Sequence, residues 1–197
     1  MRFKNQIALI TGAETGIGAK TVQKLLKEGC VVIGTNFSKK KLINKKNLEF
    51  YNIDVTNEND WKKFQIYLKK KYKKINILIN SAGIRVSGTL ESTSLELWNH
   101  VFNTNTTSIF LACKYILPLL KKTKKSSIIN LASVTGLRGV KNMLAYAASK
   151  SAIITLTSSL SLDLAKFNIR VNAIAPGAID TQMVSSLKKE INSKKKI

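Results

Sequence analysis

Short runs of β-branched and other apolar residues alternate along the chain with longer amphipathic stretches of helical period. This alternation is typical of parallel strands joined by helices that pack on both faces of the sheet. The sequence therefore predicts an α/β fold with a doubly wound parallel sheet. The expected strands are residues 6–11, 30–36, 48–54, 75–80, 127–133 and 170–174. The expected helices are residues 16–28, 61–72, 95–120 and 143–167, with a further helical stretch at 181–192.

A chain of 197 residues is long enough to bury a core, and we expect residues 1–197 to form one domain. There is no internal repeat, no flexible linker and no apolar run of the ~20 residues that a membrane span needs. Cys30 and Cys113 are far apart, and each lies in an apolar segment. We interpret them as buried free thiols, which favours a cytoplasmic location over a disulfide-forming compartment.

The formal net charge of +22 raises the question of nucleic-acid binding. The lysines, however, are spread along the chain, and their local runs are not interleaved with the aromatic residues of a base-stacking surface. This favours solvated loops and helix ends, with general attraction to acidic partners. The single histidine, His100, argues against a histidine-based metal site and a Ser-His-Asp triad, so no metal is expected.

Glycines mark the junction between the first expected strand and the first expected helix, at Gly12, Gly16 and Gly18. Glycine at such a junction lets the backbone approach a ligand closely, and the N–H groups of a helix N-terminus attract a pyrophosphate. Glycines also serve ordinary tight turns, but the flanking strand and helix favour dinucleotide binding here.

Polar or small residues also follow three other expected strands. They are Asp54, the segment Asn80-Ser-Ala-Gly83, and the segment Pro176-Gly177 with Thr181 beyond it. Asp54 could accept a hydrogen bond from an adenine amino group, although a lone Asp at a strand end is often a cap or a turn former. Since the carboxyl ends of parallel strands meet at one edge of a sheet, their convergence predicts a ligand site at that edge.

Tyr146 and Lys150 are four residues apart in an expected helix, and Ser133 lies thirteen positions before Tyr146. Residues at this spacing share one helix face. A phenol titrates near pH ~10, and a nearby ammonium group favours its ionised form. Together with a hydroxyl that can hold a carbonyl oxygen, the pair suits proton transfer. Asn105, an unfavourable residue in mid-helix, is interpreted as a functional polar residue.

In their order and spacing these motifs resemble the short-chain dehydrogenase/reductase family over essentially all 197 residues. The resemblance implies a Rossmann-like fold with strand order 3-2-1-4-5-6-7 and hydride transfer between a nicotinamide cofactor and a carbonyl or alcohol. It also implies that Tyr146 is the acid and base and that Ser133 orients the substrate oxygen. Lys150 would lower the pKa of Tyr146 and bind the nicotinamide ribose, and Asn105 would hold a water for a proton relay. The implied cofactor contacts are Gly12, Glu14, Thr15, Gly16, Ile17, Gly18, Asn36, Ser38, Asp54, Val55, Asn80, Ala82, Gly83, Tyr146, Lys150, Pro176, Gly177, Ile179 and Thr181.

The cofactor and substrate expectations also come from this resemblance, which is strongest to the 3-oxoacyl-[acyl-carrier-protein] reductase type and related alcohol dehydrogenases. The second strand ends in Asn36 with no acidic residue beside it, which favours NADP, while Thr15 in place of an arginine leaves NAD open. The substrate is then a carbonyl or alcohol. If it is a 3-oxoacyl thioester, an acidic acyl carrier protein would carry it and would contact the chain near residues 121–125. The expected substrate walls are Arg85, Leu137, Arg138, Val140 and residues 181–187. A homo-oligomer is left open.

Relatives of this kind continue with a last helix, a seventh strand and a glycine-rich segment. Their absence is expected to expose the edge of the strand at 170–174. Two alternatives to an oxidoreductase therefore stay open. One is a non-catalytic nucleotide-binding or interaction protein of the same fold, and the other, which rests on charge alone, is a nucleic-acid binder.

Overall fold

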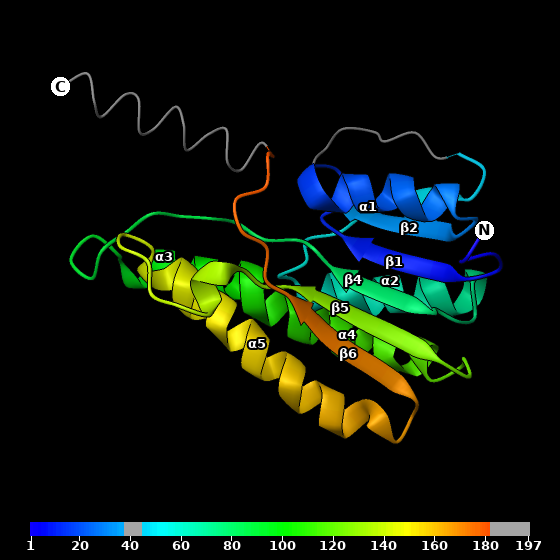
Figure 1. Cartoon of the computed structure of the whole chain (residues 1–197). Helices are drawn as coiled ribbons and strands as arrows, with labels where there is room; N and C mark the ends of the chain where they lie inside the picture. The colour runs from blue at the N-terminus through cyan, green and yellow to red at the C-terminus, as the bar shows by residue number, and fades with distance from the viewer. Residues whose placement is uncertain (38–44, 182–197) are drawn as a thin grey trace.

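Parallel strands form the centre of the structure, a computed structural model that describes residues 1–37 and 45–181. Six strands pair in the order β3-β2-β1-β4-β5-β6 (Figure 1). The predicted parallel sheet and the order of these six strands are confirmed. The strands are β1 (Ile7–Thr11), β2 (Val31–Asn36), β3 (Leu48–Asn52), β4 (Ile77–Asn80), β5 (Ser126–Leu131) and β6 (Ile169–Ile174).

Helices cover both faces of the sheet. Successive side chains of a strand point to opposite faces, and because the strands carry apolar residues on both faces, each face needs a layer of helices to bury it. On one face, Ala8 and Ile10 of β1 belong to the same buried cluster as Val22 of α1. On the other face, Leu9 of β1 joins a larger cluster with α2, α4 and α5, in which Phe64 is fully buried. Burial of one such side chain contributes about 2 kcal/mol. The helices are α1 (Gly16–Lys27), α2 (Glu58–Lys71), α3 (Leu95–Phe102), α4 (Ser108–Leu120) and α5 (Leu144–Ala165).

The helix expected at residues 95–120 contains a π-helical turn, Asn103–Thr107, between α3 and α4. Polar side chains in this turn bond outside their own helix: Thr106 Oγ1 donates to the Ser149 carbonyl oxygen at 3.1 Å. Such long-range contacts explain why a polar run can interrupt the α-helical pattern without ending the helix. The helix expected from residue 61 begins earlier, at Glu58, because the Asn57 side chain caps it by accepting from the Asn59 N–H at 2.9 Å.

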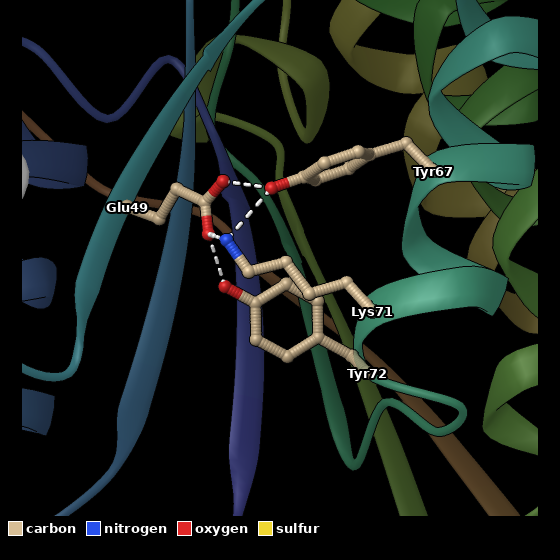
Figure 2. Close-up of polar contacts among 4 residues, drawn as sticks. All are labelled: Glu49, Tyr67, Lys71 and Tyr72. Atoms are coloured by element: carbon tan, nitrogen blue, oxygen red, sulfur yellow. Dashed lines mark hydrogen bonds and ion pairs between the residues drawn. The ribbon is translucent and has the colours of Figure 1, made fainter.

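The edge strand β3 is fastened to the end of α2 by one carboxylate (Figure 2). Glu49 accepts hydrogen bonds from the hydroxyls of Tyr67 and Tyr72, and the Lys71 ammonium lies 2.6 Å from its Oε2 atom. Burial pushes the pKa of Glu49 upward, but these hydrogen bonds outweigh it and hold the pKa below its ordinary value. Glu49 therefore stays ionised at neutral pH and pins the edge strand to α2.

The two cysteines are buried and free, as predicted. Burial raises the pKa of Cys30 to about 11 and that of Cys113 to about 12, so both thiols stay protonated at neutral pH. Among the helices of residues 1–37 and 45–181, none combines the length and the apolar character that crossing a membrane requires. The helix expected at 181–192 lies outside the described residues, apart from Thr181.

Candidate active site

A cavity of about 420 Å³ opens at the carboxyl ends of the strands, where the sequence predicts a ligand site. The loops after β1, β4, β5 and β6 form its walls together with the first residues of α1 and one face of α5. Its lining includes these expected site residues: Gly12, Thr15, Gly16, Ile17, Ala82, Gly83, Ser133, Tyr146, Lys150, Pro176, Gly177, Ile179 and Thr181.

Close backbone packing explains the glycines of the turn. Gly12 adopts φ +62°, and a Cβ there would lie 2.8 Å from the Ala82 backbone. A Cβ on Gly18 would lie 2.1 Å from the Gly12 carbonyl oxygen, so only glycine fits at position 18. Gly18 is thus buried behind the turn instead of lining the cavity, and it brings α1 against β1. With Thr15, Gly16 and Ile17 in the cavity wall, the helix N-terminus faces the cavity, which fits the pyrophosphate of a dinucleotide.

The loop after β4 is held against β1 by a hydroxyl. Thr11 Oγ1 accepts from the N–H groups of both Ser81 and Ala82 at 3.1 Å. Asn80, expected as a cofactor contact, instead turns its amide into the sheet and donates to Asn130 Oδ1 at 2.8 Å. The small residues beyond Asn80 therefore reach the cavity, but its side chain does not.

Ser133, Tyr146 and Lys150 meet in the cavity, although they come from the end of β5 and from two successive turns of α5. Only 8% of the surface of Ser133 and of Tyr146, and 5% of that of Lys150, is exposed, so the three groups act away from bulk water. The Lys150 Nζ atom lies 5.7 Å from the centre of the Tyr146 ring. It donates a hydrogen bond of 2.8 Å to the Leu131 carbonyl oxygen, which fixes its direction.

The pKa of Tyr146 is shifted by its burial and by two polar neighbours. Burial raises the pKa of the Tyr146 phenol, and the two influences that oppose it are a hydrogen bond from Ser133 and the positive charge of Arg85. Lys150, whose ammonium is turned to Leu131, is not one of these influences, and its expected role in lowering the pKa of Tyr146 stays a prediction. Burial lowers the pKa of Lys150 itself to about 8, so it still carries its proton at pH 7.

Thr135 supports Ser133 and was missed by the sequence reasoning. Its N–H and its hydroxyl both donate to Ser133 Oγ, at 3.2 and 2.9 Å. With its oxygen accepting both bonds, Ser133 directs its own proton outward, toward an oxygen in the cavity. A hydroxyl residue two positions after Ser133 was the available signal, but it becomes informative only once the turn Val134–Gly136 is known.

Asn105 lies in the π-helical turn, fully buried behind the cavity. Its Oδ1 accepts from the Ile84 N–H at 2.8 Å, and its Nδ2 donates to the Ile84 carbonyl oxygen and to Ser149 Oγ, both at 3.0 Å. The side chain thus joins the loop after β4 to the residue before Lys150. Its expected role of holding a water for a proton relay stays a prediction.

Several expected cofactor residues lie outside the cavity lining. Asp54 Oδ1 accepts from the Thr56 N–H at 2.8 Å. This oxygen therefore forms a local turn, which was the alternative to adenine binding for Asp54. The Val55 carbonyl oxygen accepts from the Trp61 indole at 2.9 Å. Asn36 is buried at the end of β2. Glu14 is absent from the lining, and so are the expected wall residues Leu137, Arg138 and Val140, whereas Arg85 is part of it. Ser38 lies outside the described residues, as do residues 182–187 of the expected wall.

Comparison with known proteins gives a consistent result. The model of the short chain dehydrogenase family matches residues 6–192. The chain is 35% identical over 195 residues to the 3-oxoacyl-[acyl-carrier-protein] reductase of Thermotoga maritima, covering 95% of this chain and 79% of that protein. It is 32% identical over 194 residues to a cyclopentanol dehydrogenase of Comamonas testosteroni, covering 94% and 78%.

Solved structures agree as well. The ligand-free aldohexose dehydrogenase of Thermoplasma acidophilum superposes with a TM-score of 0.89 at 32% identity, covering 96% of this chain and 73% of that one. The structure of ElxO with NADP bound has a TM-score of 0.87 at 33% identity, covering 96% and 79%.

Proposed function

Because this chain belongs to the short-chain dehydrogenase family, we propose that Ser133, Tyr146 and Lys150 reduce a carbonyl to an alcohol with NADPH, reversibly. Membership of this family makes the chain an oxidoreductase that acts on carbonyl or alcohol groups with a nicotinamide dinucleotide. One observation carries the assignment of residues: the three side chains line the same cavity as the glycine turn.

The proposed reaction divides between cofactor and protein. When bound, NADPH supplies a hydride to the carbonyl carbon. The Tyr146 hydroxyl donates its proton to the carbonyl oxygen, so that the C=O π bond is replaced by one C–H and one O–H bond. The Ser133 hydroxyl, oriented by Thr135, donates a hydrogen bond to the same oxygen as its negative charge grows. A proton from solvent then restores Tyr146.

Lys150 has a proposed role of binding and charge. It is protonated at pH 7 because its pKa is about 8, and its bond to Leu131 holds the ammonium beside the cavity. There it would bind the hydroxyls of the nicotinamide ribose and stabilise the phenolate that Tyr146 becomes. The depressed pKa also makes Lys150 able to exchange a proton near neutral pH.

NADP is the proposed cofactor, with NAD as the alternative. Strand β2 ends at Asn36, and Phe37 follows it, so the end of this strand carries no carboxylate that would repel a 2′-phosphate. ElxO, a structural neighbour, was solved with NADP bound. The adenine contacts expected at Asn36, Asp54 and Val55, and at Ser38 outside the described residues, belong to this proposal.

A 3-oxoacyl thioester is the proposed substrate, in keeping with the reductase of Thermotoga maritima. An acidic carrier protein would be attracted by the high positive charge of the chain. Residues 121–125, however, precede β5, whereas Ser133 follows it. The lysines of this loop therefore lie at the edge of the sheet opposite the cavity, and a carrier would need another contact surface. A cytoplasmic location is part of the proposal, because both cysteines are free.

The test measures NADPH and NADH oxidation with an acetoacetyl thioester, a cyclic ketone and an aldose. Turnover with at least one of them is expected, and Tyr146→Phe should lower it about 10²- to 10⁴-fold while NADPH binding, followed by fluorescence, stays within twofold. Tyr115→Phe is the matched control, since the Tyr115 hydroxyl bonds Glu58 at 2.6 Å, outside the cavity lining. Full activity of Tyr146→Phe would refute the assignment, and NADPH binding without any turnover would support the non-catalytic alternative.

A further inference from the structure

The segments that lead into the six strands meet at the edge of the sheet opposite the cavity, on the right of Figure 1. All strands of a parallel sheet start at one edge, so segments that are far apart in sequence form a single face there. They are residues 1–6, 27–30, 45–47, 72–76, 121–125 and 166–168. Their exposed cations are Arg2, Lys4, Lys27, Lys45, Lys46, Lys73, Lys74, Lys121, Lys122, Lys124, Lys125 and Lys166. These cations form the basic edge, so lysine runs that are scattered in the sequence gather on one side of the molecule.

Hydrogen bonds hold neighbouring segments of the basic edge against one another. Between the segments before β1 and β2, the Phe3 N–H donates to the Glu28 carbonyl oxygen at 3.1 Å. Between the segments before β5 and β6, Asn168 makes two bonds. Its carbonyl oxygen accepts from the Ser126 N–H at 3.2 Å, and its Nδ2 donates to the Lys124 carbonyl oxygen at 2.7 Å. The cations are therefore carried on segments that the sheet fixes in a row.

Carboxylates are scarce at the basic edge. Within the six segments, all of which the structure describes, Glu28 is the only one. It accepts hydrogen bonds from the Arg2 N–H and guanidinium at 3.0 and 3.4 Å. The carboxylates that come next to these segments in sequence are Glu49, which the Lys71 ammonium binds at 2.6 Å, and Asp163. Because the cations far outnumber these carboxylates, the edge carries a large net positive charge.

The other side chains of these segments restrict the kind of polyanion that fits. Met1 is the one exposed large apolar residue among them, so the basic edge lacks the apolar side chains that anchor a peripheral protein in a membrane interface. Its aromatic rings are covered by cations: the Lys121 Nζ atom lies 3.6 Å from the centre of the Phe167 ring, and the Arg2 guanidinium 5.7 Å from that of Phe3. Rings covered in this way offer no platform for the unpaired bases of a single strand. The row of ammonium groups that remains suits a phosphate backbone.

We infer that the basic edge binds double-stranded nucleic acid along its phosphate backbone, without preference for sequence. Adjacent strands of a sheet are about 4.8 Å apart, so the row across six strands is about 24 Å long, the length of about seven base pairs. An acidic carrier protein would have to deliver its substrate at the opposite edge, where the cavity opens. A bound duplex would leave the cavity open, so this binding is independent of the proposed reaction.

Fluorescence anisotropy with a labelled DNA duplex of mixed sequence, about 20 base pairs long, measures this binding at several salt concentrations. With about six to eight phosphate contacts, a plot of log K against log salt should have a slope of about −5 to −7. The triple variant Lys122→Gln, Lys124→Gln, Lys125→Gln should bind the duplex about 10- to 100-fold more weakly and flatten the slope by about 2 to 3. Saturating NADPH should not displace the duplex from the native protein.

A second triple variant, Lys62→Gln, Lys63→Gln, Lys141→Gln, is the matched control. It loses the same charge at exposed positions outside the basic edge, and its affinity should change by less than about threefold. Both variants should keep the native melting temperature, because all the replaced side chains are exposed.

Four results would overturn the inference. Equal weakening in both triple variants would mean that total charge attracts DNA without a defined surface. Displacement of the duplex by NADPH would place it in the cavity, and tighter binding of a single strand of the same length would contradict the covered aromatic rings. Vesicles of phosphatidylserine and phosphatidylcholine that bind more tightly than the duplex, with the same loss in the first variant, would assign the edge to a membrane. A duplex Kd weaker than about 10⁻⁴ M at about 0.15 M salt would show that the edge does not bind nucleic acid.

Discussion

Replacing Lys150 by methionine should stabilise the protein at neutral pH while it abolishes activity. Lys150 is buried, and burial alone lowers its pKa from 10.5 to about 8. At about 1.4 kcal/mol for each pH unit, this difference corresponds to a cost of about 3 kcal/mol for keeping the ammonium charged in the folded state. Loss of the hydrogen bond to Leu131 returns about 1 kcal/mol of that cost, so Lys150→Met should gain about 2 kcal/mol at pH 7.

The pH dependence distinguishes this explanation from simple packing. Between pH 8 and 10.5 an unfolded lysine keeps its proton while the folded Lys150 loses it. The unfolded state then binds more protons, so the stability of the native protein rises with pH across this window. The advantage of Lys150→Met should therefore be constant below pH 8, shrink above it, and reverse by about 1 kcal/mol near pH 10.5.

Urea unfolding of both proteins from pH 6.5 to 10.5, followed by the fluorescence of the buried Trp61, measures this difference. Subtracting the two curves removes the contribution of the other lysines. Lys20→Met, at an exposed position of α1, should show no pH-dependent difference from the native protein. A gap between native protein and Lys150→Met that stays the same at every pH would refute the reasoning from burial.

Two further substitutions test the frame of the cavity. Gly18→Ala places a Cβ 2.1 Å from the Gly12 carbonyl oxygen and should destabilise the protein by about 1 to 3 kcal/mol and weaken NADPH binding, as measured by thermal unfolding and fluorescence titration. Gly139→Ala is its control, because a Cβ there meets open space and the residue is exposed and outside the cavity lining. An unchanged melting temperature would contradict the close packing of α1 on β1. Asn105→Ala removes both partners of the Ile84 backbone and should cost about 2 to 3 kcal/mol in urea unfolding and lower kcat. Loss of kcat at full stability would mean that Asn105 acts on the reaction directly.

Much of the architecture follows from local patterns in the chain. Short β-branched and apolar runs predict the strands, and the glycines at 12, 16 and 18 predict the junction that the structure places at the cavity. Tyr146 and Lys150 are one helical turn apart, so their common face needs no tertiary information. The exact ends of elements were less predictable, as in α2, where a cap at Asn57 adds a turn to the expected helix.

The directions of the buried polar side chains were decided only by the tertiary structure. Lys150 turns to a carbonyl nineteen residues earlier, Asn80 to Asn130, and Asn105 to Ile84, and each bond joins elements that are separate in sequence. A buried polar group must find a partner among whatever the packing brings near it, and a local pattern carries no record of those neighbours. The residue types and their spacing thus determined which groups reach the site. The packing of β4, β5 and α5 decided which of them bond the surrounding backbone and side chains and which face the cavity.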